Sequence, residues 1–153
     1  MQLRYGILST SSIAPRFIAA LREADAGQVV ALSSRSPEKA REKAALWQIP
    51  RSYGSHKELL EDPDVDIVYI SNVNTEHYPW AMAALEHGKH AVCEKPCTTT
   101  QAQTRVLFRS GSGKGPVPHG SGKNAPPSPF LCPRYHPFSA QSLQDFACYL
   151  QYI

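Results

Sequence analysis

Short apolar runs alternate with longer segments of helical periodicity along the first hundred residues. The apolar runs cover residues 3–8, 28–33, 65–71 and 90–93. Four helices are expected to begin near Ile13, Ser36, Ser55 and Thr75, and a fifth at Thr100. Strands that alternate with helices at this spacing form βαβ units, whose right-handed crossovers build a parallel sheet. The pattern therefore predicts an α/β fold, a doubly wound parallel sheet with helices on both faces.

Polar residues at the expected helix starts support this assignment. Ser36-Pro37-Glu38 combines an N-cap serine, a proline at the first helical position and an acidic residue favoured by the helix dipole. Ser55 with Glu58, and Thr100 with Gln103, have the spacing of capping boxes. The starts of three helices are thus predicted from local sequence alone.

The composition changes after residue 103. Residues 1–103 contain 12 of the 13 acidic residues, whereas residues 104–153 contain seven of the 13 prolines and five of the 9 glycines. The net charge of +3 therefore comes from the C-terminal part. No helical or strand periodicity continues after Phe108. We expect a folded domain over 1–108, with an incomplete sheet, followed by an irregular Pro/Gly-rich tail over 109–153.

Several classes of protein and site are disfavoured by simple features of the chain. No apolar run reaches the roughly 18 residues of a membrane span, and the first residues lack the apolar core of a signal peptide, so we expect a cytoplasmic protein without a membrane partner. Five basic residues spread over the last fifty form too thin a patch to predict nucleic-acid binding. The spacing of the histidines and cysteines does not match a zinc site, so no metal is expected.

Ligands of an open parallel sheet bind at the carboxyl ends of its strands, where the strand order reverses. The first loop there aligns Ser9, Ser11 and Ala14 with the three small positions of a G-x-G-x-x-G/A phosphate-binding turn. Only the last position fits, which leaves both a phosphate-binding turn and an ordinary polar turn open. Serine is nevertheless small, and its hydroxyl and N–H group can face a phosphate at a helix N-terminus.

The loop after the second strand carries Arg35 between serines. Sites that select NAD usually carry an acidic residue here, which binds the ribose 2′-hydroxyl. The sequence has none, and an arginine flanked by hydroxyl groups suits a 2′-phosphate instead. The loop therefore favours NADP, with NAD as the alternative cofactor. A surface arginine without a ligand is the other interpretation.

The loop after the fourth strand begins Glu94-Lys95-Pro96. A lysine at the carboxyl edge of a buried strand is costly to desolvate, which favours a functional role. The alternative is an exposed Glu–Lys ion pair that contributes little to stability.

At these loops the sequence resembles the Gfo/Idh/MocA family of NAD(P)-dependent oxidoreductases, in particular its NADP-using branch of dihydrodiol and xylose dehydrogenases. The matching segments are 5–14, 33–40, 53–55, 62–70, 84–90 and 93–96. The resemblance implies that 1–108 is an NAD(P)-binding Rossmann domain and that Lys95 is the catalytic residue, acting on the oxygen of a sugar-like hydroxyl or carbonyl substrate during hydride transfer. The residues that it places at the cofactor are Ser9, Thr10, Ser11, Ser12, Ile13, Ser34, Arg35, Ser71, Asn72, Asn74, His77, Glu94 and Lys95.

The sequence departs from the family pattern in two loops and in the tail. Ser9 and Ser11 replace glycines, and Asn72-Val-Asn74 stands where Thr/Leu-Pro-Asn is usual. After Phe108 the family pattern stops within a helix, although a one-nucleotide shift of a permitted coding sequence restores a helix end and a strand. Our hypothesis is truncation or a reading-frame shift at this point, with a genuine disordered tail as the alternative.

Members of the family continue into a second domain that binds substrate and supports oligomers. The resemblance thus implies that this chain alone is inactive and that a homo-oligomer would need that domain. A non-catalytic nucleotide-binding or regulatory module is the alternative function.

Overall fold

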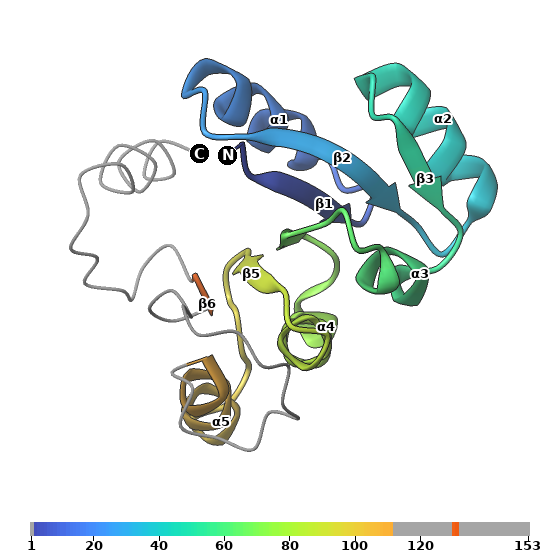
Figure 1. Ribbon diagram of the computed structural model, residues 1–153. Helices are drawn as coiled ribbons and strands as arrows, with labels where there is room; N and C mark the ends of the chain where they lie inside the picture. The colour runs from blue at the N-terminus through green and yellow to red at the C-terminus, as the bar shows by residue number, and fades with distance from the viewer. Residues whose placement is uncertain (1, 112–129, 132–153) are drawn as a thin grey trace.

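The computed structural model describes residues 2–111 and 130–131 (Figure 1). The strands are β1 (Arg4–Leu8), β2 (Gln28–Ser33), β3 (Arg51–Tyr53), β4 (Ile67–Ile70), β5 (His90–Cys93) and β6 (Phe130–Leu131). The helices are α1 (Ala14–Glu23), α2 (Pro37–Trp47), α3 (His56–Glu61), α4 (Asn74–Glu86) and α5 (Gln101–Gly111). Residues 112–129 and 132–153, which make up most of the segment predicted to be an irregular tail, lie outside the described residues.

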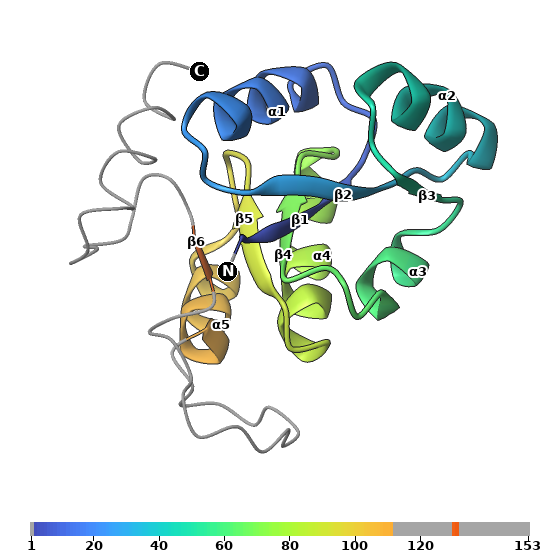
Figure 2. The ribbon, with the colours of Figure 1, turned by 45° about the horizontal axis from the view of Figure 1, so that its top comes forward.

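The strands form one parallel sheet in the order β3-β2-β1-β4-β5-β6 (Figure 2). The chain moves outward from β1 to β3, then returns to the other side of β1, so the strand order reverses between β1 and β4. This is the order of a doubly wound dinucleotide-binding fold, and it confirms the predicted fold class.

Two edge strands were not predicted. β3 has three half-buried residues, without the apolar run that marks the four central strands. β6 has two residues, which lie in the segment expected to be irregular and pair in parallel with Ala91 and Val92 of β5. α5 also crosses the domain boundary predicted at residue 108 and ends at Gly111.

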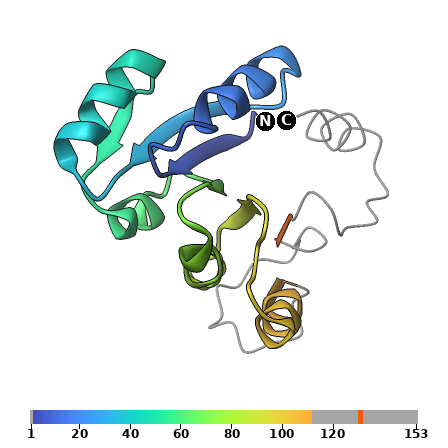
Figure 3. The same ribbon diagram turned by 180° about the vertical axis from the view of Figure 1, so that it is seen from behind.

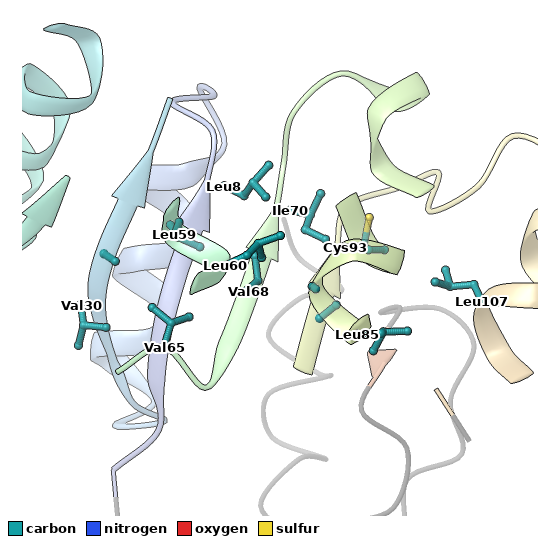
Figure 4. Close-up of a cluster of buried hydrophobic side chains, with 14 residues drawn as sticks. Leu8, Val30, Leu59, Leu60, Val65, Val68, Ile70, Leu85, Cys93 and Leu107 are labelled. Carbon is teal, nitrogen blue, oxygen red and sulfur yellow. The ribbon is translucent and has the colours of Figure 1, made fainter. Parts of the chain in front are cut away.

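Helices cover both faces of the sheet, as Figures 1 and 3 show from opposite sides. On one face α1 and α2 pack on the strands, and the buried side chains include Phe17, Leu21 and Ala44. On the other face α3, α4 and α5 contribute Leu59, Leu60, Leu85 and Leu107, among other residues, to a second cluster (Figure 4). Two separate cores thus hold the sheet rigid between helix layers.

The predicted helix starts are confirmed by their hydrogen bonds, although Ser55 accepts from Lys57 and not from Glu58, the residue that its predicted capping box requires. The Oγ atom of Ser36 accepts from Lys39 N at 3.3 Å, and that of Ser55 accepts from Lys57 N at 3.2 Å. Thr100 Oγ1 accepts from Gln103 N at 3.2 Å. These bonds satisfy N–H groups that a helix end otherwise leaves without partners. None of the described helices is long and apolar enough to cross a membrane.

Candidate cofactor-binding site

A cavity of about 560 Å³ opens at the carboxyl ends of β1, β2 and β4, where the strand order reverses. It is lined by Ser9, Thr10, Ser11, Ser12, Ser34, Arg35, Ser36, Lys39, His56, Ser71, Asn72, Val73 and Glu76. Hydroxyl groups dominate this lining, with two cationic side chains on one side. The position and the polarity are those of a dinucleotide site on an open parallel sheet.

The β1–α1 loop turns tightly around Ser9. Its φ of 127° lies in the region that favours glycine. Ser9 N donates to Ser33 O at 3.1 Å, and Ser9 Oγ accepts from Ser11 N at 3.0 Å. These bonds hold a serine in the conformation that the first glycine of the phosphate-binding turn normally supplies.

Helix α1 begins directly behind this turn. No side chain caps its N-terminus, where Ile13 is the N-cap residue. The N–H groups of a first turn, together with the helix dipole, attract an anion such as phosphate. Ser11 Oγ also donates to Ser71 Oγ at 2.7 Å, which joins the β1–α1 loop to the β4–α4 loop across the point where the strand order reverses.

Charged groups lie at the β2 side of the cavity. Arg35 Nη1 lies 3.5 Å from Glu76 Oε1, and the Arg35 side chain is 77% exposed. Glu76 Oε2 accepts from Asn72 Nδ2 at 2.9 Å. Asn72 Oδ1 is buried, with no hydrogen bond from the described residues. Arg35 thus places an exposed positive charge at this side of the cavity, and Asn72 and Glu76 are held beside it.

His77 connects this loop to the loop after β5. It is buried, and its Nε2 and Nδ1 atoms lie 2.9 Å from Asn72 O and 2.8 Å from Pro96 O. The imidazole therefore fixes two loops relative to each other. It does not line the cavity, which indicates a positioning role.

Glu94 and Lys95 follow β5 beside the cavity. Tyr69 OH donates to Glu94 Oε1 at 2.6 Å, and burial, followed by the hydrogen bond to Glu94, raises the pKa of Tyr69. This bond orients the carboxylate. Lys95 is exposed. Its backbone N donates to Glu94 Oε2 at 3.4 Å.

The structure brings most of the predicted cofactor residues together. Those that line the cavity are Ser9, Thr10, Ser11, Ser12, Ser34, Arg35, Ser71 and Asn72. Those that do not are Ile13, Asn74, His77, Glu94 and Lys95. Sequence reasoning missed Ser36, Lys39, His56, Val73 and Glu76. Ser36 and Lys39 come within four residues of Arg35, at the start of α2, so the sequence could have indicated them. His56 lies on a predicted helix, but the sequence does not show that this helix packs beside the cavity.

Residues 3–115 match the model of an oxidoreductase family with an NAD-binding Rossmann fold. The chain belongs to the Gfo/Idh/MocA oxidoreductase family. This match confirms the predicted family, and it extends beyond residue 108, where the family pattern was expected to stop.

Dehydrogenases from two vertebrates resemble this part of the chain. Trans-1,2-dihydrobenzene-1,2-diol dehydrogenase from Xenopus laevis is 39% identical over 110 residues, which are 71% of this chain and 33% of that protein. The mouse (Mus musculus) enzyme of the same name is 36% identical over 117 residues, 75% of this chain and 35% of its own. The chain thus spans about a third of the length of these relatives.

Solved structures show the same fold. An NAD-binding oxidoreductase from Klebsiella pneumoniae superposes with a TM-score of 0.71 and 29% identity, over 74% of this chain and 32% of that one. A 3-ketoreductase from Actinomadura kijaniata, crystallised with NADP and TDP-benzene, superposes with a TM-score of 0.70 and 30% identity, over 74% and 35% of the two chains.

Proposed function

We propose that the cavity binds NADP and that the chain is the cofactor-binding part of a dehydrogenase acting on hydroxyl or carbonyl groups of a sugar-like or diol substrate. The observation that carries this proposal is the polar cavity at the strand-order reversal, with Arg35 at the end of β2 in place of an acidic residue. Relatives named as diol dehydrogenases and a ketoreductase crystallised with NADP support the cofactor and the reaction class.

The residues of the cavity fit the parts of such a cofactor. The uncapped N-terminus of α1 and the hydroxyl groups of the β1–α1 loop suit the pyrophosphate. Arg35 and Lys39 supply positive charge for a 2′-phosphate. Val73 is 55% exposed and offers an apolar surface for the adenine.

Lys95 is the catalytic candidate. NADP would supply the hydride acceptor or donor, and Lys95 Nζ would give a proton to, or take it from, the substrate oxygen. Glu94, oriented by Tyr69, would lie beside it at the nicotinamide end of the site. Because only about a third of the relatives' length is matched, we infer that the chain alone binds NADP weakly and turns over no substrate. We also infer a cytoplasmic location.

Calorimetric titration of the purified chain with NADP⁺ and NAD⁺ tests the cofactor. We expect tighter binding of NADP⁺. Arg35→Ala should weaken NADP⁺ binding about tenfold or more and leave NAD⁺ nearly unchanged, because a charge-assisted bond to phosphate contributes about 1.5 kcal/mol or more.

Arg41→Ala is the matched control, because Arg41 lies on the same side of α2 as Glu38, with which it pairs, and does not line the cavity. Equal losses for both nucleotides in the Arg35 variant would contradict the assignment of the 2′-phosphate. Binding of neither nucleotide would contradict the proposed function, and steady NADP⁺ reduction by the chain alone would contradict its inactivity.

A further inference from the structure

His56 is a buried histidine that no part of the proposed function uses. It is the first residue of α3, is 6% exposed, and lines the cavity beside the end of β2. Its ring packs edge-to-face against Trp80 of α4, with centroids 5.1 Å apart. The ring is therefore held between two helices and the sheet, rather than directed freely into solvent.

One ring nitrogen is fixed by the sheet. His56 Nδ1 lies 2.9 Å from Oγ of Ser33, the last residue of β2, whereas Ser33 Oγ is a longer 3.5 Å from Ile7 O. Because the contact to Nδ1 is the shorter one, we assign the Ser33 hydroxyl as the donor to Nδ1. The hydrogen of the neutral imidazole is then on Nε2. No hydrogen bond to Nε2 is found within the described residues, so a residue that lines the cavity keeps one ring nitrogen without a partner there.

The location of His56 indicates which part of a nucleotide this atom meets. The end of β2 is where a Rossmann fold contacts the 2′ position of the adenosine ribose. Ser34 and Arg35 line the cavity at the same place. We propose, building on the proposed NADP site, that His56 is a specificity-determining residue whose Nε2–H donates to the 2′-substituent and whose protonated form favours phosphate over hydroxyl.

The charges around the ring define the expected pH dependence. Arg35 from the β2–α2 loop, Lys39 from α2 and Glu76 from α4 line the same cavity, while Ser33 and Trp80, in contact with the ring, are uncharged. Burial is the main cause that lowers the pKa of His56, opposed by Glu76 and reinforced by Arg35. A bound 2′-phosphate adds negative charge and favours the imidazolium, so the affinity for NADP⁺ should rise as the pH falls, more than the affinity for NAD⁺.

The test is the ratio of the NAD⁺ and NADP⁺ dissociation constants, measured by calorimetry on the full chain from pH 5.5 to 8. The ratio should rise toward low pH on the order of fivefold more in the wild type than in His56→Gln, which keeps an amide near Nε2 but does not titrate. His56→Asn keeps an amide near Nδ1 and the Ser33 contact, and should also flatten the profile. Because the 2′-phosphate itself titrates near pH 6, the comparison with these variants isolates the imidazole.

His87→Gln is the control, since His87 lies at the end of α4, where its Nδ1 is 2.8 Å from Ala83 O, and does not line the cavity. The pH dependence of the ratio in this variant should equal that of the wild type.

A second measurement needs no variant: the NMR titration midpoint of the His56 Cε1–H signal should rise with NADP⁺ and not with NAD⁺. Nucleotide binding with an unchanged midpoint, or a His56→Gln profile equal to the wild type, would overturn the proposal. Binding of neither nucleotide to the wild type would instead overturn the NADP site on which it rests.

Discussion

At the scale of single residues, His77 shows how one side chain can organise a site that it does not line. Both of its ring nitrogens face backbone carbonyl oxygens, Asn72 O and Pro96 O, from two different loops. One of these loops forms the cavity wall and the other carries Lys95. The resemblance placed His77 among the cofactor residues, and the structure shows that its contacts are to the backbone of those loops.

We expect His77→Leu to lower the free energy of unfolding by about 2 kcal/mol, because the ring contacts to Asn72 O and Pro96 O are lost and a carbonyl oxygen that accepts from the imidazole N–H loses its donor. The amide nitrogen of His77→Gln can reach one of these oxygens, so the free energy of unfolding of this variant should lie between those of the leucine variant and the wild type. Urea unfolding followed by circular dichroism measures both. A leucine variant as stable as the wild type would show that these contacts do not stabilise the fold.

At the scale of elements, the packing of α3 on β1 depends on the absence of a side chain at Gly6. A Cβ atom added there would lie 2.9 Å from Leu59 Cδ2 and 3.0 Å from Val65 Cγ1. Leu59 is fully buried, so it has little room to move. The same helix carries His56, and its distance from the sheet therefore helps to set the cavity wall.

Gly6→Ala should lower the free energy of unfolding by about 1–3 kcal/mol through overpacking. Leu59→Ala alone should also destabilise, by about 2–5 kcal/mol, because it leaves a cavity. The double variant should be more stable than the sum of the two losses implies, since removal of the leucine relieves the crowding. Additive losses in urea unfolding would indicate that Gly6 and Leu59 do not interact.

At the scale of the whole molecule, the carboxyl ends and the amino ends of the strands have different roles. The cavity lies at the carboxyl ends, whereas an ion-pair network lies at the amino ends. There Asp66, just before β4, accepts from Arg4 Nε at 2.9 Å and from Nη2 at 2.8 Å, and Arg4 also reaches Asp64. The network joins β1 to β4 at the opposite end from the site.

The hydrogen bond from Arg4 is the main cause that lowers the pKa of Asp66. A carboxylate whose pKa is lower in the folded than in the unfolded state stabilises the fold above its unfolded value, near 3.9, and loses this contribution as the pH falls through the folded value. Asp66→Asn should therefore be less stable than the wild type at pH 7, and the difference should shrink below about pH 4. Urea unfolding at several pH values measures it, and a difference independent of pH would refute the ionic role.

Much of this arrangement was predictable because its causes are local. The central strands are apolar runs, and Ser36, Ser55 and Thr100 start helices through bonds to residues two or three positions away. The edge strands were not predictable in the same way, since β3 has no apolar run and β6 exists through pairing with β5. Likewise, Arg35 and Ser71 follow strands and could be placed at the site, whereas His56 enters from a helix whose position depends on packing.

The sequence by itself determined the βαβ alternation, the family and the polar loops that follow the central strands, because strand burial, helix capping and motif spacing are properties of neighbouring positions. Only the tertiary structure decided which loops share one cavity, that Glu76 meets Arg35 across it, and that His77 and Lys95 lie outside its lining. These relations join residues tens of positions apart. They are set by the packing of helices on a twisted sheet, which no local pattern encodes.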